Sequence, residues 1–173
     1  MDCGAHTGLI SDLILHCGGR VHCFEPNIIL NVILQNKYQN NPDVTINNVA
    51  VSDKNTTTRF LLNSSVSQIN RISESGDNYD YYGESYEVSV IDLTTYIEDV
   101  LKESESIYLL KMDIEGAEFE IMDKIIAKKL YEKITYIVCE THESFFKDGD
   151  EKLKKLKDQL SAHQIENVFL DWI

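Results

Sequence analysis

The feature that most constrains the fold is an alternation of strand-like and helix-like segments along the chain. Strand-like runs lie at 21–24, 44–51, 88–91, 107–112, 134–139 and 168–172, and helix-period segments lie at 9–14, 28–33, 93–101, 117–130 and 151–160. Such alternation is typical of parallel strands, because each crossover between them needs a helix-length connection. The sequence therefore predicts an α/β fold with an open, mostly parallel sheet and helices on both faces.

One domain accounts for the length of the chain, and its middle carries an insertion. A chain of 173 residues with 43% hydrophobic residues can bury a core without disulfides or a structural metal. We therefore predict a single domain over residues 1–173. Between residues 53 and 91 the alternation weakens into polar residues around a short strand-like run at 59–62, which predicts an inserted hairpin and loop.

The charge of the chain restricts its partners. Its 16 basic and 29 acidic side chains give a net charge of −13, which repels phosphate backbones and argues against nucleic acid. No apolar run approaches the roughly 20 residues that span a bilayer, and no secretion signal opens the chain. Its four cysteines form no CxxC pair, so no zinc or redox site is indicated. We expect a cytoplasmic protein that binds a small ligand and neither nucleic acid nor a membrane.

Four acidic residues directly follow strand-like runs, at the point where each run ends. They are Glu25, Asp53, Asp113 and Glu140. In an open parallel sheet the carboxyl ends of the strands share one edge, where ligands bind beside the strand-order switch. The sequence therefore predicts a binding site at this edge.

A glycine turn opens the chain and leads directly into the first predicted helix. Gly4 and Gly8 lie in this turn, where the backbone can approach a ligand and the helix start offers free N–H donors; a plain structural turn is the alternative. The spacing is not the GxGxxG of dinucleotide enzymes, which weakens the case for a pyrophosphate. Glu25 stands where a carboxylate accepts hydrogen bonds from both hydroxyls of a ribose. Together these features indicate a nucleoside-bearing cofactor.

The same segments resemble the FkbM-type methyltransferases, which use S-adenosylmethionine. The resemblance rests on DxGAxxG (2–8), FEPN (24–27), NVAVSD (48–53), LLKMDIEGAEFEIM (109–122) and IVCETHE (137–143), in the same order over nearly the whole chain. The KMDIEGAE block is the most specific, because strand or helix packing alone does not require its acidic residues and glycine. The resemblance implies the class I methyltransferase fold, which is Rossmann-like, and O-methylation of a hydroxyl on a small molecule or a sugar or glycan.

The resemblance also implies roles for individual residues. The residues expected to hold the methionine moiety are Asp2, Gly4, Ala5 and Gly8, with Glu25 at the ribose and Asn27, Ser52 and Asp53 near the adenine. Those expected to face the methyl group and the acceptor are Asp113, Glu115, Glu140 and His142, with Glu118 one turn into the following helix. The catalytic candidates among them are His142, Glu140 and Asp113.

O-methyl transfer requires an aligned acceptor hydroxyl and a group that removes its proton. His142 suits this role because its ordinary pKa is about 6.5, and a neighbouring strand-end carboxylate could orient its ring. A histidine that only caps a loop is the alternative. In a second mechanism Asp113, Glu140 and His142 bind a divalent ion that lowers the pKa of the acceptor hydroxyl. Nothing in the spacing demands a metal, so the sequence does not favour one.

Two departures from the family pattern leave alternatives open. Only Met1 precedes Asp2, so the first strand, normally central in this sheet, is expected to be essentially absent, and the chain ends after one strand-like run where the family has two. Exposed sheet edges left by a missing strand would favour a homodimer. The alternatives to an O-methyltransferase are a non-catalytic methyltransferase-like binding or assembly module and a nucleotide-sugar or NAD(P)-dependent enzyme.

Overall fold

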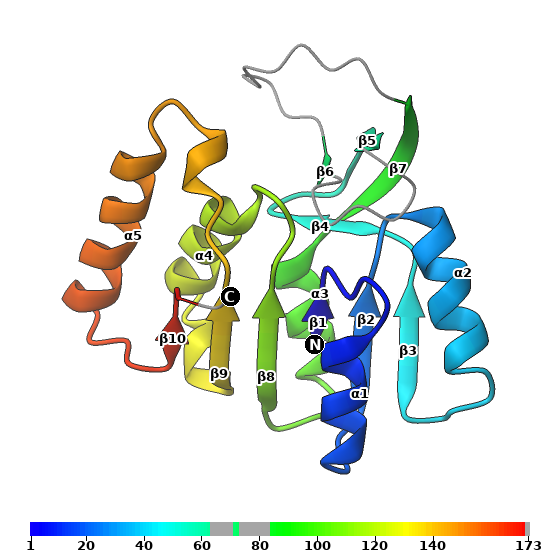
Figure 1. Cartoon of the computed structure of the whole chain (residues 1–173). Helices are drawn as coiled ribbons and strands as arrows, with labels where there is room; N and C mark the ends of the chain where they lie inside the picture. Colours follow the sequence, from blue (N-terminus) through cyan, green and yellow to red (C-terminus); the bar gives the residue numbers. More distant parts are fainter. Residues whose placement is uncertain (63–70, 73–83, 172–173) are drawn as a thin grey trace.

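Six parallel strands form the main sheet of the protein. A computed structural model describes residues 1–62, 71–72 and 84–171, in which these strands follow the order β10-β9-β8-β1-β2-β3 (Figure 1). Their bounds are β1 Asp2–Cys3, β2 Val21–Phe24, β3 Val44–Asn47, β8 Ile107–Met112, β9 Ile134–Cys139 and β10 Val168–Phe169. Starting from β1, the chain adds β2 and β3 on one side of it, and later adds β8, β9 and β10 on the other side. The strand order therefore switches between β1 and β8, which is where open α/β sheets bind ligands.

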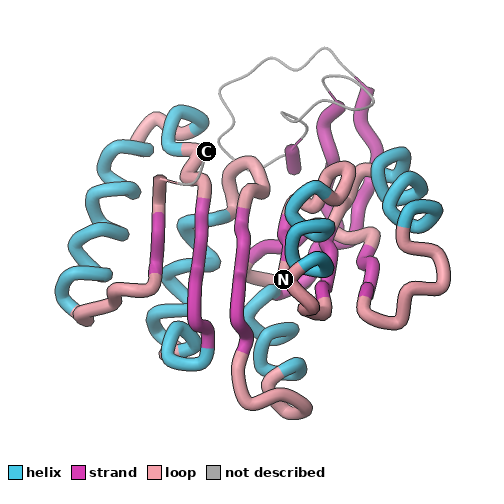
Figure 2. Tube along the Cα trace, turned by 60° about the horizontal axis from the view of Figure 1, so that its bottom comes forward, coloured by secondary structure: helices cyan, strands magenta, loops and turns pink. Residues whose placement is uncertain are grey.

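Helices cover both faces of this sheet. They are α1 Leu9–His16, α2 Ile28–Lys37, α3 Leu93–Val100, α4 Glu118–Ala127 and α5 Gly149–Ala162, with 3-10 turns at Leu130–Lys133 and Glu143–Phe145. Figure 1 shows α1 in front of the strands and α3 and α4 behind them, and Figure 2 shows the strands between helices from a second direction. The predicted α/β fold is thus confirmed. No helix in the described part of the chain is long and apolar enough to cross a membrane.

The larger apolar core packs α3 and α4 against the sheet. Leu110 of β8 and Ile137 of β9 are fully buried, and so are Ile121 and Ile125 of α4, whose four-residue spacing places them on one helix face. This core fixes the carboxyl ends of β8 and β9 relative to the start of α4.

A second sheet arises from the insertion and has the order β4-β7-β5-β6. Its strands are β4 Ala50–Ser52, β5 Thr56–Leu62, β6 Arg71–Ile72 and β7 Glu84–Asp92, and β5 pairs with β7 antiparallel. The expected single strand over residues 44–51 is therefore wrong, because it divides into β3 and β4 in different sheets. The division falls at Asn47 and Asn48, whose side-chain amides donate to the carbonyls of Cys23 (3.0 Å) and Glu25 (2.8 Å) at the end of β2.

The first strand is short, as expected, but it is not absent. Asp2 pairs with Cys23 of β2 on one side and Lys111 of β8 on the other, so β1 closes the centre of the sheet. The edges of the sheet are instead β3 and β10. The argument that a missing strand exposes an edge is therefore wrong, and the homodimer stays a prediction without that support.

Two further elements end earlier than the sequence predicts. The helix expected over 117–130 stops at Ala127, because Lys129 adopts a left-handed conformation (φ 54°) that breaks the helix. The last strand stops at Phe169, after which Asp171 forms an isolated bridge with Glu140, and residue 172 lies outside the described residues.

Candidate active site

A hollow of about 670 Å³, its open mouth included, lies at the carboxyl ends of β1, β2 and β8. Its lining residues are Gly4, His6, Phe24, Glu25, Pro26, Asn27, Leu30, Val49, Ala50, Val51, Phe60, Asp113, Ile114 and Glu115. The hollow therefore occupies the predicted sheet edge at the strand-order switch.

Gly4 sets the distance between the turn after β1 and the loop after β8. It has a φ of +77°, and a Cβ atom there would lie 1.8 Å from the carbonyl oxygen of Asp113. Its N–H donates to the carbonyl of Phe24 (3.0 Å). Glycine is thus required at this position by the approach of two backbone segments, in addition to its place in the wall of the hollow.

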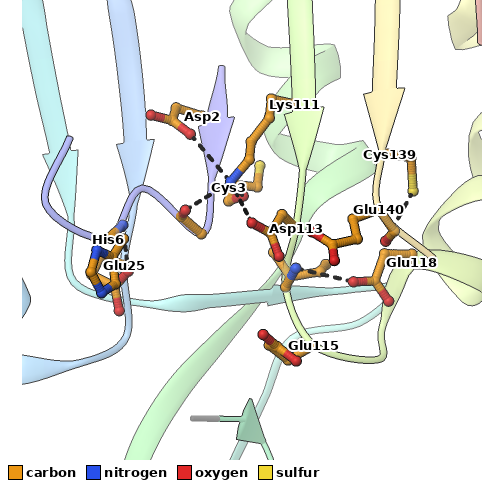
Figure 3. Close-up of polar contacts among 12 residues, drawn as sticks. Asp2, Cys3, His6, Glu25, Lys111, Asp113, Glu115, Glu118, Cys139 and Glu140 are labelled. Carbon is orange, nitrogen blue, oxygen red and sulfur yellow. Dashed lines mark hydrogen bonds and ion pairs between the residues drawn. The ribbon is translucent and has the colours of Figure 1, made fainter. Parts of the chain in front are cut away.

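Glu25 follows β2 and is held from both sides by the backbone. Its two carboxylate oxygens accept hydrogen bonds from the N–H groups of His6 (2.8 Å) and Asn27 (2.9 Å), as Figure 3 shows for His6. Burial raises the pKa of Glu25, although these two hydrogen bonds oppose the rise. Each oxygen keeps a second lone pair, so this fixed carboxyl group can accept from the hydroxyls of a ligand.

Lys111 is a buried cation that was not among the predicted site residues. Its ammonium group donates to the carbonyls of Gly4 (2.9 Å) and Cys3 (3.3 Å), and lies 3.2 Å from Asp113 Oδ2 and 3.8 Å from Asp2 Oδ1 (Figure 3). It therefore ties the end of β1 to β8 and neutralises acidic groups behind the hollow.

His142 lies among acidic side chains beside the end of β9. Its Nδ1 is 2.8 Å from Glu118 Oε1, and its Nε2 is 3.2 Å from Glu115 Oε2. Asp113 Oδ1 and Glu140 Oε1 are each 3.9 Å from the same Nε2. The structure thus brings together all three catalytic candidates, along with Glu115 and Glu118, which the resemblance also placed near them.

The charges of this cluster change its protonation. Burial alone would lower the pKa of His142, but the hydrogen bond to Glu118 and the surrounding carboxylates raise it to about 9. Burial raises the pKa of Glu115 to about 7. With this pKa His142 is protonated at neutral pH, so the expected ordinary pKa is wrong, and its role as general base stays a prediction. The carboxylate that orients its ring is Glu118 of α4, not the strand-end Glu140.

Several residues predicted at the cofactor do not line the hollow. Asp2 is buried beneath α1, where it accepts a hydrogen bond from Ser11 (2.6 Å). Ser52 ends β4 in the second sheet and Asp53 follows it, so Asp53 does not share the edge of the other three acids. Ala5 and Gly8 were also predicted to hold the cofactor, but they lie in the turn before α1 and do not line the hollow. The Tyr38 hydroxyl donates to the Gly8 carbonyl (2.8 Å).

No individual role was predicted for the other lining residues, although Val49 to Val51 belong to the NVAVSD segment (48–53). Val49 to Val51 and Phe60 form apolar wall, and apolar residues in strand-like runs predict only burial. His6 belongs to the glycine turn and Pro26 follows Glu25, so their position next to predicted residues could have indicated them.

Fold and site together define an α/β protein with a hollow lined by carboxyl groups at the switch point of a parallel sheet. Residues 2–168 match the family described as the methyltransferase FkbM domain. The chain belongs to this FkbM methyltransferase family.

The similarity extends to a solved structure. The crystal structure of methyltransferase FkbM from Methylobacillus flagellatus KT is similar to this chain, with a TM-score of 0.53 and 18% sequence identity. The match covers 92% of this chain and 36% of that chain. At this identity the likeness supports the fold alone. The chain matches no curated protein.

Proposed function

We propose that this chain binds S-adenosylmethionine in the hollow and transfers its methyl group to a hydroxyl of a small molecule or a sugar. The observation that carries the proposal is the donor set of the hollow. The buried carboxyl group of Glu25 stands at the end of β2, and the carboxyl groups of Asp113 and Glu115 stand at the end of β8.

The residues present fit this cofactor. Phe24, Leu30 and Phe60 supply apolar surface for an adenine ring, and Glu25 can accept hydrogen bonds from the ribose. The cofactor supplies a methyl group that a positively charged sulfonium has already activated. Carboxylates at the β8 end favour such a positive charge.

The same donor set argues against a nucleotide-sugar or NAD(P)-dependent enzyme. The described residues that line the hollow include three glutamate or aspartate side chains and no lysine or arginine. A pyrophosphate in this hollow would be repelled by these carboxylates and would find no cationic side chain to neutralise it.

The chain's own residues would position the acceptor. A hydroxyl at the β8 end of the hollow lies within reach of Asp113 and Glu115, whose carboxylates can accept its proton. His142 and Glu140 flank this position beyond them. Holding the acceptor in line with the methyl group can itself supply about 7–11 kcal/mol of the barrier.

The first test is calorimetric titration with S-adenosylhomocysteine, the demethylated cofactor. We expect the chain to bind it and Glu25→Gln to bind at least about tenfold more weakly, because a charged acceptor contributes roughly 1.5–3 kcal/mol. Glu87→Gln is the matched control, since Glu87 is exposed on β7 and outside the hollow. Circular dichroism checks that both variants fold.

The outcomes separate the proposal from a non-catalytic binding or assembly module. Binding that is unchanged in Glu25→Gln contradicts the assigned pocket. An absence of binding in the unaltered chain favours the non-catalytic module. If the cofactor binds, release of S-adenosylhomocysteine from S-adenosylmethionine with hydroxyl-bearing sugars, compared with the same sugars lacking one hydroxyl, identifies the acceptor class.

A further inference from the structure

Two side chains that line the hollow and one beside it bring potential metal-ligating atoms close together. Asp113 and Glu115 follow β8, and His142 follows β9, and one ligand atom from each lies within 4.8 Å of the others. Ligands that bind one ion at about 2.1 Å lie about 3.0–4.2 Å apart in an octahedral site. The three atoms therefore need only a small closing movement to share a divalent cation.

Glu118 fixes the orientation of the histidine. Its buried carboxylate accepts hydrogen bonds from the N–H groups of Ile114 (3.0 Å) and Gly116 (2.9 Å), so it also accepts from His142 Nδ1 (2.8 Å). This contact turns Nε2 toward Asp113 and Glu115. A carboxylate that holds the far nitrogen of a histidine is the usual outer support of a histidine ligand to a metal.

One carboxylate oxygen of Glu115 has an ion-pair contact but no hydrogen bond. Its Oε2 atom is buried and accepts no hydrogen bond from any described residue, although it lies 3.2 Å from His142 Nε2. The backbone of Glu115 has a φ of +63°, which is uncommon for a residue other than glycine. A bound cation would stabilise a buried carboxylate oxygen that accepts no hydrogen bond.

The charges around this position are not balanced. Three carboxylates lie around it, from Asp113, Glu115 and Glu140, and that of Glu118 lies behind the His142 ring. Among the described residues, the only cationic groups in contact with these carboxylates are His142 and Lys111. Lys111 lies on the far side of Asp113, where its ammonium group also binds the carbonyls of β1.

We propose that Asp113, Glu115 and His142 bind a divalent cation at the mouth of the hollow. One imidazole nitrogen and two carboxylate oxygens suit Mn²⁺ and Mg²⁺, with remaining positions open to water or to an acceptor hydroxyl. Binding displaces the Nε2 proton, because one lone pair cannot hold both. The role of the cation rests on the proposed function: it would bind the acceptor hydroxyl and lower its pKa. Whether the cation binds does not depend on that function.

The test is a titration of the full chain with Mn²⁺, in which electron paramagnetic resonance measures the free ion. We expect one saturable site per chain, weakened at least about tenfold in Glu115→Gln and in Asp113→Asn. Glu151→Gln, exposed on α5, is the matched control and should bind as the unaltered chain does. Glu115→Gln removes a charge at an oxygen that accepts no hydrogen bond from a described residue, so this variant is expected to fold.

A second measurement locates the ion. Bound Mn²⁺ should broaden the proton magnetic resonance signals of the His142 ring and leave those of the exposed His16 and His163 sharp. Weak binding that is equal in all variants would overturn the proposal and identify the ion as a counterion of an acidic surface. A tight site unaffected by Glu115→Gln would overturn it as well.

Titration with S-adenosylhomocysteine in the same samples separates the two proposals. Loss of Mn²⁺ binding with intact S-adenosylhomocysteine binding overturns the metal site alone. Mn²⁺ binding without S-adenosylhomocysteine binding leaves the metal site standing and contradicts the proposed function.

Discussion

Glu118 is the residue on which the geometry of the acidic cluster depends, and Glu118→Gln tests this directly. The carboxylate is fully buried at the first residue of α4 and accepts from Ile114 N, Gly116 N and His142 Nδ1. Glutamine has nearly the same shape but carries one acceptor oxygen and one NH₂ donor. The substitution therefore places a donor against a donor and removes the charge that faces the His142 ring.

The expected loss of stability follows from these contacts. An N–H group left without an acceptor in a buried site costs about 1–3 kcal/mol. Removing one partner of a buried ion pair costs about 3–5 kcal/mol, a figure that already contains such a penalty. We therefore expect the free energy of unfolding to fall by about 3–5 kcal/mol, which is a large share of the roughly 5–15 kcal/mol typical of a domain.

Urea denaturation followed by circular dichroism measures this loss. Asp123→Asn is the matched control, because Asp123 lies on the same helix and pairs with Lys155 at 2.6 Å on the surface, where both side chains are exposed. The control should cost no more than about 1 kcal/mol. A loss in Glu118→Gln as small as that in Asp123→Asn would refute the argument that Glu118 holds the cluster together.

Two further predictions concern the backbone and the pH dependence of stability. Gly4→Ala should cost at least about 3 kcal/mol in urea denaturation, because its Cβ meets the Asp113 carbonyl, whereas Gly18→Ala, with similar φ and open space, should cost only about 1–2 kcal/mol. Equal losses would contradict the close approach. Burial would raise the pKa of Asp92, but hydrogen bonds from Thr94 and Lys124 lower it to about 2. Because the pKa is lowered on folding, the Asp92 carboxylate contributes roughly 2 kcal/mol of stability above pH 4 that is lost as pH falls through about 2. Between pH 2 and pH 5, the melting temperature of Asp92→Asn should depend less on pH than that of the unaltered chain. An equal pH dependence in the two proteins would contradict the stabilising role of the Asp92 carboxylate.

The sequence predicts the layers of the fold well, because these depend on local patterns. The apolar residues of α4 recur at helical spacing, and those of β8 and β9 form continuous runs. Residues of all three elements are buried in the same core. Glu25 and Asp113 could be placed at the sheet edge for the same reason, since a residue at the end of a parallel strand has few other positions available.

The sequence could not predict features that depend on distant partners. The division between β3 and β4 requires amide contacts from Asn47 and Asn48 to β2, and no local pattern contains them. The burial of Lys111 is likewise unexpected, because lysine is almost never fully buried unless it is paired. Its partners are the carbonyls at the end of β1, more than a hundred positions earlier in the chain.

The structure explains why the DIEGAE segment carries acidic residues and glycine at fixed positions. Glu118 binds the backbone of residues 114 and 116, which closes the loop after β8 into a fixed turn. Gly116 has a φ of +125°, which side-chain-bearing residues rarely adopt, and allows this closure. The closed turn points Asp113 and Glu115 toward His142, which Glu118 also binds. A change at Glu118 should therefore weaken Mn²⁺ binding although Glu118 is not a ligand, because it alters the loop and the histidine together.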